Sequence, residues 1–327
     1  MSSWRWHRKA LLVAAIFAVG FGGAAYARYR PSIHGARARV STGSHIAVTR
    51  CGPIEYAEQG DGAPVLVVHG AGGGFDQALD LAEGLTRAGY RVIAPSRFGY
   101  LRTPLPADGS AEAQADAHAC LLDALHVPAA VIMGVSAGGP SSLQFALRFP
   151  DRTRALVLLV PATYSPNHTP VARASRLTMF VFDAVLRSDF LFWAGNRVAP
   201  RAYLRTILGT PPELVAAAPP DEQARLQTAI DHILPVSARR QGLLNDARVV
   251  SSLPRYALER ITAPTIAIST EDDGYGTFAG ARYTAEHIPG ARFLGYPSGG
   301  HMLVGRSPDA SAQTVAFLRG LGPDAHH

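Results

Sequence analysis

Short apolar segments alternate with helix-like segments along most of this chain, and that alternation restricts the folds open to it. Pro64–Val68, Ala129–Met133, Arg154–Val160 and Thr265–Ser269 are short and mostly apolar. Segments of this kind are typical of strands that helices cover on both faces. Helical patterns lie between them, for example over Ser110–Leu125. The sequence therefore predicts an α/β protein with a doubly wound, mostly parallel sheet.

The alternation stops after residue 160 and resumes near residue 261. The intervening segment has mainly helical patterns separated by proline clusters, and residues 179–193 are rich in aromatic side chains. Helices inserted between two strands of a sheet are expected to form a cap. We therefore predict a core in two parts, residues 40–160 and 261–322, with a helical cap over residues 161–260.

The N-terminal 30 residues have the three parts of a targeting sequence. Arg5, Arg8 and Lys9 form a basic start, and the uncharged segment Ala10–Ala27 follows. Its last three residues, Ala-Tyr-Ala, fit the small-x-small pattern of a signal-peptidase site. The same 18 residues are close to the length that crosses a bilayer as a helix. Residues 1–30 are thus predicted to be a signal peptide or an N-terminal membrane anchor, which would place the domain outside the cytoplasm or at a membrane.

The charge distribution argues against nucleic acid as a partner. The formal net charge is +6, but the arginines are scattered and Lys9 is the only lysine. A nucleic-acid-binding surface concentrates its basic residues on one element.

The two cysteines, Cys51 and Cys120, are too few for a disulfide scaffold, and neither has a CxxC partner. The two cysteines could pair if the domain lies outside the cytoplasm, but we expect two inert thiols. The oligomeric state is not predicted.

The strongest chemical motif is Gly134-Val135-Ser136-Ala137-Gly138, which follows an apolar strand and precedes a helical pattern. A sharp strand-to-helix turn of this kind exposes the serine hydroxyl, and glycines on either side avoid collisions. Ser136 is therefore the candidate nucleophile.

A serine hydroxyl needs a base, and the base needs a carboxylate that orients it. In this arrangement the chain order is serine, acid, histidine. Asp272 and Asp273 follow the strand Thr265–Ser269, and His301 follows the strand Arg292–Tyr296 through a glycine pair. His301 is the candidate base and Asp273 the candidate acid, with Asp272 as the alternative.

Together with Gly134–Gly138, the motifs His69-Gly70-Ala71-Gly72-Gly73-Gly74 and Gly299-Gly300-His301 resemble those of the α/β-hydrolase superfamily, in its lidded, esterase- or lipase-like form. One oxyanion-hole N–H is expected from Ala137, the residue after the nucleophile. The resemblance implies that Ala71 supplies the other. It also implies that His69 and Arg97 are structural, with Arg97 in an ion pair beneath the loop. No metal-binding motif is present, and neither a metal nor a cofactor is expected.

These features predict a serine hydrolase that cleaves an ester, or a similar acyl bond, of a small apolar molecule. Two alternatives remain open. One is cleavage of a C–C or amide bond, including peptidase activity, by the same three residues. The other is a ligand-binding receptor that keeps the fold without turnover, because a fold alone does not determine function.

Overall fold

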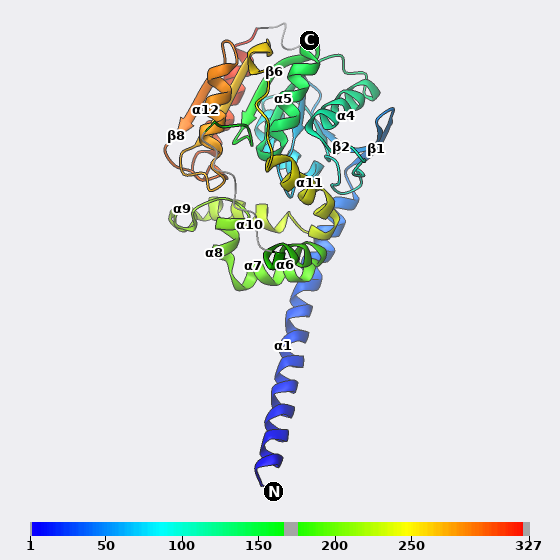
Figure 1. Cartoon of the computed structure of the whole chain (residues 1–327), viewed down its shortest axis with the longest axis vertical. Coiled ribbons are helices and arrows are strands. Elements are labelled where there is room, and N and C mark those ends of the chain that lie inside the picture. The colour runs from blue at the N-terminus through cyan, green and yellow to red at the C-terminus, as the bar shows by residue number, and fades with distance from the viewer. Residues whose placement is uncertain (1, 167–175, 323–327) are drawn as a thin grey trace.

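A single eight-stranded sheet forms the centre of the molecule in a computed structural model that describes residues 2–166 and 176–322 (Figure 1). The strand order is β1-β2-β4-β3-β5-β6-β7-β8. β1 (His45–Thr49) and β2 (Gly52–Gln59) form an antiparallel hairpin, and β2 pairs antiparallel with β4. All later pairs are parallel. The predicted doubly wound, mostly parallel sheet is confirmed.

The parallel strands are short, and the central ones are buried along nearly their whole length because helices cover both of their faces. Their bounds are β3 (Pro64–Val68), β4 (Arg91–Pro95), β5 (Ala130–Val135), β6 (Thr153–Leu159), β7 (Thr265–Thr270) and β8 (Arg292–Tyr296).

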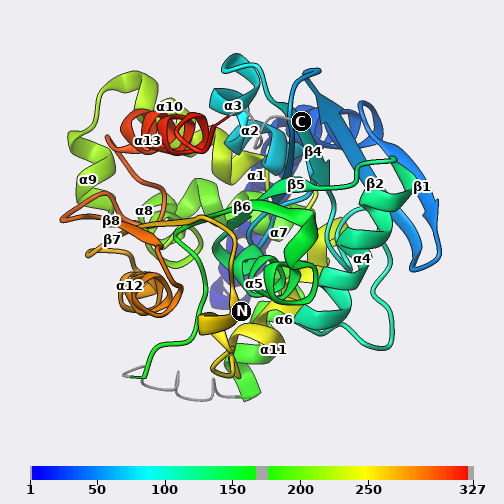
Figure 2. The same cartoon turned by 90° about the horizontal axis from the view of Figure 1, so that it is seen from above.

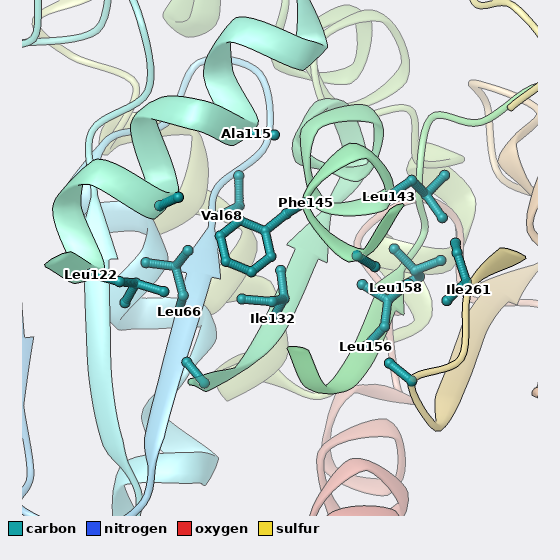
Figure 3. Packing of buried hydrophobic residues seen from close by; sticks show 14 of the residues in the cluster. Leu66, Val68, Ala115, Leu122, Ile132, Leu143, Phe145, Leu156, Leu158 and Ile261 are labelled. Atoms are coloured by element: carbon teal, nitrogen blue, oxygen red, sulfur yellow. The ribbon is translucent and has the colours of Figure 1, made fainter. Parts of the chain in front are cut away.

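Two layers of helices enclose the sheet (Figure 2). One face carries α4 (Ala111–Ala124), α5 (Gly139–Arg148) and α12 (Thr277–His287), and the other carries α2 (Phe75–Leu81), α3 (Glu83–Arg87) and α13 (Ser307–Arg319). Figure 3 shows Phe145 of α5 packed over Leu66 and Ile132 of the strands. All three side chains are fully buried, and burying a side chain of this size contributes about 1.5–3 kcal/mol.

The predicted helical insertion lies between β6 and β7, and we refer to its helices α6–α11 as the cap. They are α6 (Arg176–Arg187), α7 (Asp189–Val198), α8 (Pro200–Thr206), α9 (Pro212–Ala217), α10 (Pro220–Asp231) and α11 (Arg240–Val250). The short 3₁₀ helix η3 (Val236–Arg239) precedes α11. Most of the cap has its own buried apolar cluster, separate from the two that flank the sheet.

The N-terminal segment forms one long helix, α1 (Ser2–Ser41), which continues well past the predicted boundary at residue 30. Its first half projects away from the rest of the molecule, beyond the cap (Figure 1). In its second half Tyr29, Ile33 and Ala36 are buried in the cap cluster. Among the residues whose side chains the structure describes, which begin at residue 22 in α1, no helix is long and apolar enough to cross a membrane.

The prediction of two free thiols was wrong: Cys51 and Cys120 form a disulfide. Cys51 lies in the turn of the β1–β2 hairpin, and Cys120 lies on α4, which packs against that hairpin. The two residues are 69 positions apart, so only the tertiary packing of the hairpin on α4 brings them together. The disulfide therefore links the edge of the sheet to the helical layer.

Candidate active site

Ser136 lies at a sharp turn between β5 and α5, in the short 3₁₀ helix η1 (Ser136–Gly138). Its φ angle of 49° is in the left-handed region, where a non-glycine residue is strained. The flanking glycines are required by close packing. A Cβ atom on Gly134 would lie 2.5 Å from Ser142 Oγ, and one on Gly138 would lie 2.3 Å from the carbonyl oxygen of Val68. The turn therefore holds the serine at the carboxyl end of β5.

Three of the predicted site residues lie within hydrogen-bond distance of one another. His301 Nε2 is 2.9 Å from Ser136 Oγ. On the other side of the ring, Nδ1 is 2.8 Å from Asp273 Oδ2. The imidazole and the carboxylate are both buried, whereas Ser136 is only partly so. This is the geometry of a nucleophile, a base and an acid that orients the base.

The two adjacent aspartates have different neighbours. Asp273 accepts hydrogen bonds from the Tyr275 backbone N–H, at 2.8 Å, and from the Thr277 hydroxyl, which fixes its carboxylate beside the imidazole. Asp272 instead accepts from the backbone N–H groups of Gly299 and Gly300, at 2.9 and 2.7 Å. The structure thus places Asp273 against His301, while Asp272 holds the turn that leads to it.

Tyr275 covers the imidazole and was not identified from the sequence. Its ring meets that of His301 edge-on, with 4.8 Å between centroids. Its hydroxyl donates to the carbonyl oxygens of Thr206 and Ile207 in the cap, at 3.1 and 2.9 Å. Although Tyr275 is 51% exposed, partial desolvation and the nearby Asp273 raise its pKa to about 12, so the phenol is protonated and can donate at neutral pH. Only its position two residues after Asp273 could have suggested a role.

The loop after β3 brings Ala71 near Ser136, and Ala137 directly follows the serine. Gly70 lies so close that a Cβ atom on it would be 3.1 Å from Ser136 Cβ. Ala71 is exposed, and its N–H donates to no acceptor among the described residues. Ala137 is at the start of the helical segment that leads into α5. Two backbone N–H groups near a serine are the donors that a developing oxyanion needs.

His69 has both ring nitrogens occupied inside the protein. Nδ1 donates to the carbonyl oxygen of Gly70 at 2.7 Å, and Nε2 accepts from the Arg97 backbone N–H at 2.9 Å. Burial, together with the charge of Arg97, holds the pKa of His69 well below its ordinary value. His69 is therefore a neutral group that shapes the loop, and its geometry leaves no nitrogen to act as a base.

Arg97 makes the ion pair that the sequence indicated. Its guanidinium binds the carboxylate of Asp246, on cap helix α11, at 2.6 Å. No sequence motif marks Asp246.

Among the described residues, no group of three or more histidine, cysteine, aspartate or glutamate side chains could hold a metal ion.

The fold and this arrangement of serine, histidine and aspartate define an α/β hydrolase. The family model described as the alpha/beta hydrolase fold matches residues 63–306, and the chain belongs to this family. It is 26% identical over 276 residues to an uncharacterized hydrolase, YcgS, of Bacillus subtilis, which covers 83% of this chain and 95% of that protein.

Two further proteins are similar to this chain. The chain is 40% identical over 154 residues to 2-hydroxymuconate semialdehyde hydrolase of Pseudomonas putida, a match that covers 41% of this chain and 53% of that protein. Among solved structures, an alpha/beta hydrolase fold protein from Nakamurella multipartita is 28% identical and superposes with a TM-score of 0.67, covering 85% of this chain and 100% of that one.

Proposed function

We propose that this α/β hydrolase is a serine esterase that cleaves a carboxylic ester, or a similar acyl bond, of a small apolar molecule. The observation that carries the proposal is the continuous set of contacts from Ser136 Oγ through the His301 ring to Asp273, at 2.9 and 2.8 Å. These distances need no rearrangement before a proton can move from the serine to the imidazole.

In the proposed reaction, Ser136 Oγ attacks the ester carbonyl while His301 Nε2 takes its proton. Asp273 holds the ring and stabilises its charged form. The Ala71 and Ala137 N–H groups stabilise the negative charge that develops on the carbonyl oxygen. Collapse of this intermediate expels the alcohol, which takes the proton from His301. Water then attacks the acyl-enzyme with the same histidine as base, which releases the acid and restores Ser136.

Apolar groups beside the loop after β3 and beside His301 support an apolar substrate. Cap residue Ile233 is next to Gly72 in that loop, and the Tyr275 ring covers His301. Phe190 and Trp193 of the cap pack against Tyr29 of α1, so these two rings support the structure of the cap.

The test is active-site labelling with a fluorophosphonate, beside turnover of p-nitrophenyl esters of increasing chain length. Wild-type protein is expected to label at Ser136 and to hydrolyse the esters, and Ser136→Ala to do neither. His301→Ala should label at least about 100-fold more slowly, because the serine loses its base. A folded wild-type protein that neither labels nor turns over any ester would contradict the proposal and leave the ligand-binding alternative.

C–C bond hydrolysis by the same residues is the second candidate. The observation that favours it is the partial match to a hydrolase whose named substrate, 2-hydroxymuconate semialdehyde, is not an ester. Comparing kcat/KM for that compound with kcat/KM for p-nitrophenyl butyrate separates the two candidates. Amide cleavage is compared in the same way with an anilide of the same acid.

We further propose that the protein works outside the cytoplasm or attached to a membrane through its N-terminal segment. The basic start, the uncharged stretch and the Ala25–Ala27 site support this localisation, and the Cys51–Cys120 disulfide fits an oxidising compartment. The intact mass and the cell fraction of the natively expressed protein test it. Recovery of a full-length chain in the cytosol with two free thiols would contradict it.

A further inference from the structure

Two peptide units determine where the proposed oxyanion-hole donors point. The C=O of Gly70 and the N–H of Ala71 belong to one planar trans unit, so they point in opposite directions. The same holds for the C=O of Ser136 and the N–H of Ala137. The Ser136 carbonyl accepts from the Ala162 N–H at 2.9 Å, which fixes the second unit within the core of the fold.

Arg97 helps to orient the peptide unit between Gly70 and Ala71. Arg97 Nη2 donates to the Gly70 carbonyl oxygen at 3.2 Å, and His69 Nδ1 donates to the same oxygen. The next peptide unit is held in a related way, because the Gly72 N–H donates to the hydroxyl of Tyr100 at 3.3 Å. Arg97 and Tyr100 therefore hold the peptide planes on both sides of Ala71.

Both of these side chains are in turn held by Asp246. Its Oδ1 accepts from Arg97 Nη1 at 2.7 Å and its Oδ2 from Nη2 at 2.6 Å, a two-point pairing that fixes the plane of the guanidinium. The Tyr100 hydroxyl donates to Oδ2 at 2.5 Å. Asp246 is 6% exposed and Arg97 is 5% exposed, so the two form a buried ion pair in which each neutralises the charge of the other.

Asp246 belongs to cap helix α11, whereas the residues it organises belong to the core. We propose that Asp246 is a positioning residue that uses Arg97 and Tyr100 to aim the Ala71 N–H at the oxyanion. The cap would then be required for the catalytic step itself, in addition to any part in admitting substrate. This inference rests on the proposed esterase function.

The test compares Asp246→Asn with Asp189→Asn. Asp189 is also a buried cap carboxylate, 7% exposed, but it accepts its hydrogen bonds from Ser237 at 2.9 and 3.0 Å. With p-nitrophenyl butyrate, and active sites counted by fluorophosphonate labelling, kcat per active site should fall by about 10- to 100-fold in Asp246→Asn. KM should stay within about threefold, since ground-state binding is retained. Asp189→Asn should keep the wild-type kcat per active site.

Two further measurements keep the test informative if Asp246→Asn folds poorly or lacks activity. Tyr100→Phe removes one hydroxyl without a charge and should lower kcat about tenfold with KM unchanged, even if Asp246→Asn folds poorly. Amide hydrogen exchange over residues 69–75 needs no activity, and it should be faster in Asp246→Asn than in Asp189→Asn.

The outcomes are distinct. Equal kcat per active site and equal exchange in the two aspartate variants would overturn the role of Asp246 while leaving the esterase intact. A wild-type protein that neither labels nor turns over would overturn the esterase. The exchange comparison would then still decide whether Asp246 orders the loop.

Discussion

Neighbouring side chains of the same chemical type have different tasks around His301. Asp273 contacts the imidazole directly, and Asp272 contacts only backbone N–H groups of the preceding turn. Gly300 in that turn has φ of 60°, which a glycine adopts without strain. One carboxylate therefore acts on the ring, and the other acts on the path of the chain that carries it.

Replacing each aspartate by asparagine should separate these tasks. Asp273→Asn is expected to lower kcat for p-nitrophenyl butyrate by about 10³- to 10⁴-fold, because an amide neither selects the right imidazole tautomer nor stabilises its charged form. Asp272→Asn keeps an oxygen that accepts from Gly300 and should cost at most about tenfold. Steady-state kinetics of both variants, with active sites counted, is the measurement. A larger loss in Asp272→Asn would reverse the two assignments.

Three segments that are far apart in the sequence meet at Asp76, near the start of α2. Arg239 of η3 is fully buried and donates to Asp76 and, at 2.5 Å, to the carbonyl oxygen of Gly73. Arg39 of α1 donates to the same carboxylate at 3.2 Å and to the carbonyl oxygen of Leu234 at 2.6 Å. The N-terminal helix, the cap and the glycine-rich loop are therefore joined through one charged group.

This junction should appear in the acid unfolding of the protein. Burial alone would raise the pKa of Asp76, but Arg239 and Arg39 outweigh it and lower the pKa to about 2, from 3.8. A carboxyl with a lowered folded-state pKa stabilises the protein above its unfolded pKa and loses that contribution as the pH falls. About 2 kcal/mol should therefore disappear between about pH 4 and pH 2.

Urea unfolding at pH 4.5 and at pH 2.5 measures this loss. Asp76→Asn should be less stable than wild type at pH 4.5 and should lose about 1.5 kcal/mol less between pH 4.5 and pH 2.5. Asp61→Asn, which changes an exposed carboxylate in a turn, is the control and should follow wild type. Identical acid sensitivity of wild type and Asp76→Asn would contradict the role of Asp76.

Local patterns predicted the elements of the core well, because residues that are neighbours in the sequence determine which segments form buried strands and where turns occur. Ser110, for example, begins the predicted helical pattern, and it caps α4 by accepting from the Ala113 N–H at 3.1 Å. Ser136 was recognisable for the same reason. Asp246 and the Cys51–Cys120 pair were not, since each depends on the packing of one distant segment on another. Similarly, the predicted leader ends at residue 30, yet Tyr29 and, beyond that boundary, Ile33 lie in the buried cluster of the cap.

The molecule as a whole has a compact body and one extended arm. The sheet and its two helical layers form the larger part of the body, the cap lies beside them, and the first half of α1 reaches beyond the cap (Figure 1). Because α1 is buried against the cap in its second half and bonded to α2 through Arg39, the arm has a firm base.

The arm also determines how the protein would sit on a solid support. Lysine occurs once in the sequence, at position 9, and this position belongs to the first half of α1, which projects beyond the cap (Figure 1). In a protein that retains residues 1–30, amine-reactive beads or sensor chips would therefore capture the chain through this arm, with the body held off the matrix. Every immobilised copy would have the same orientation, an advantage that enzymes with lysines spread over their surface do not offer.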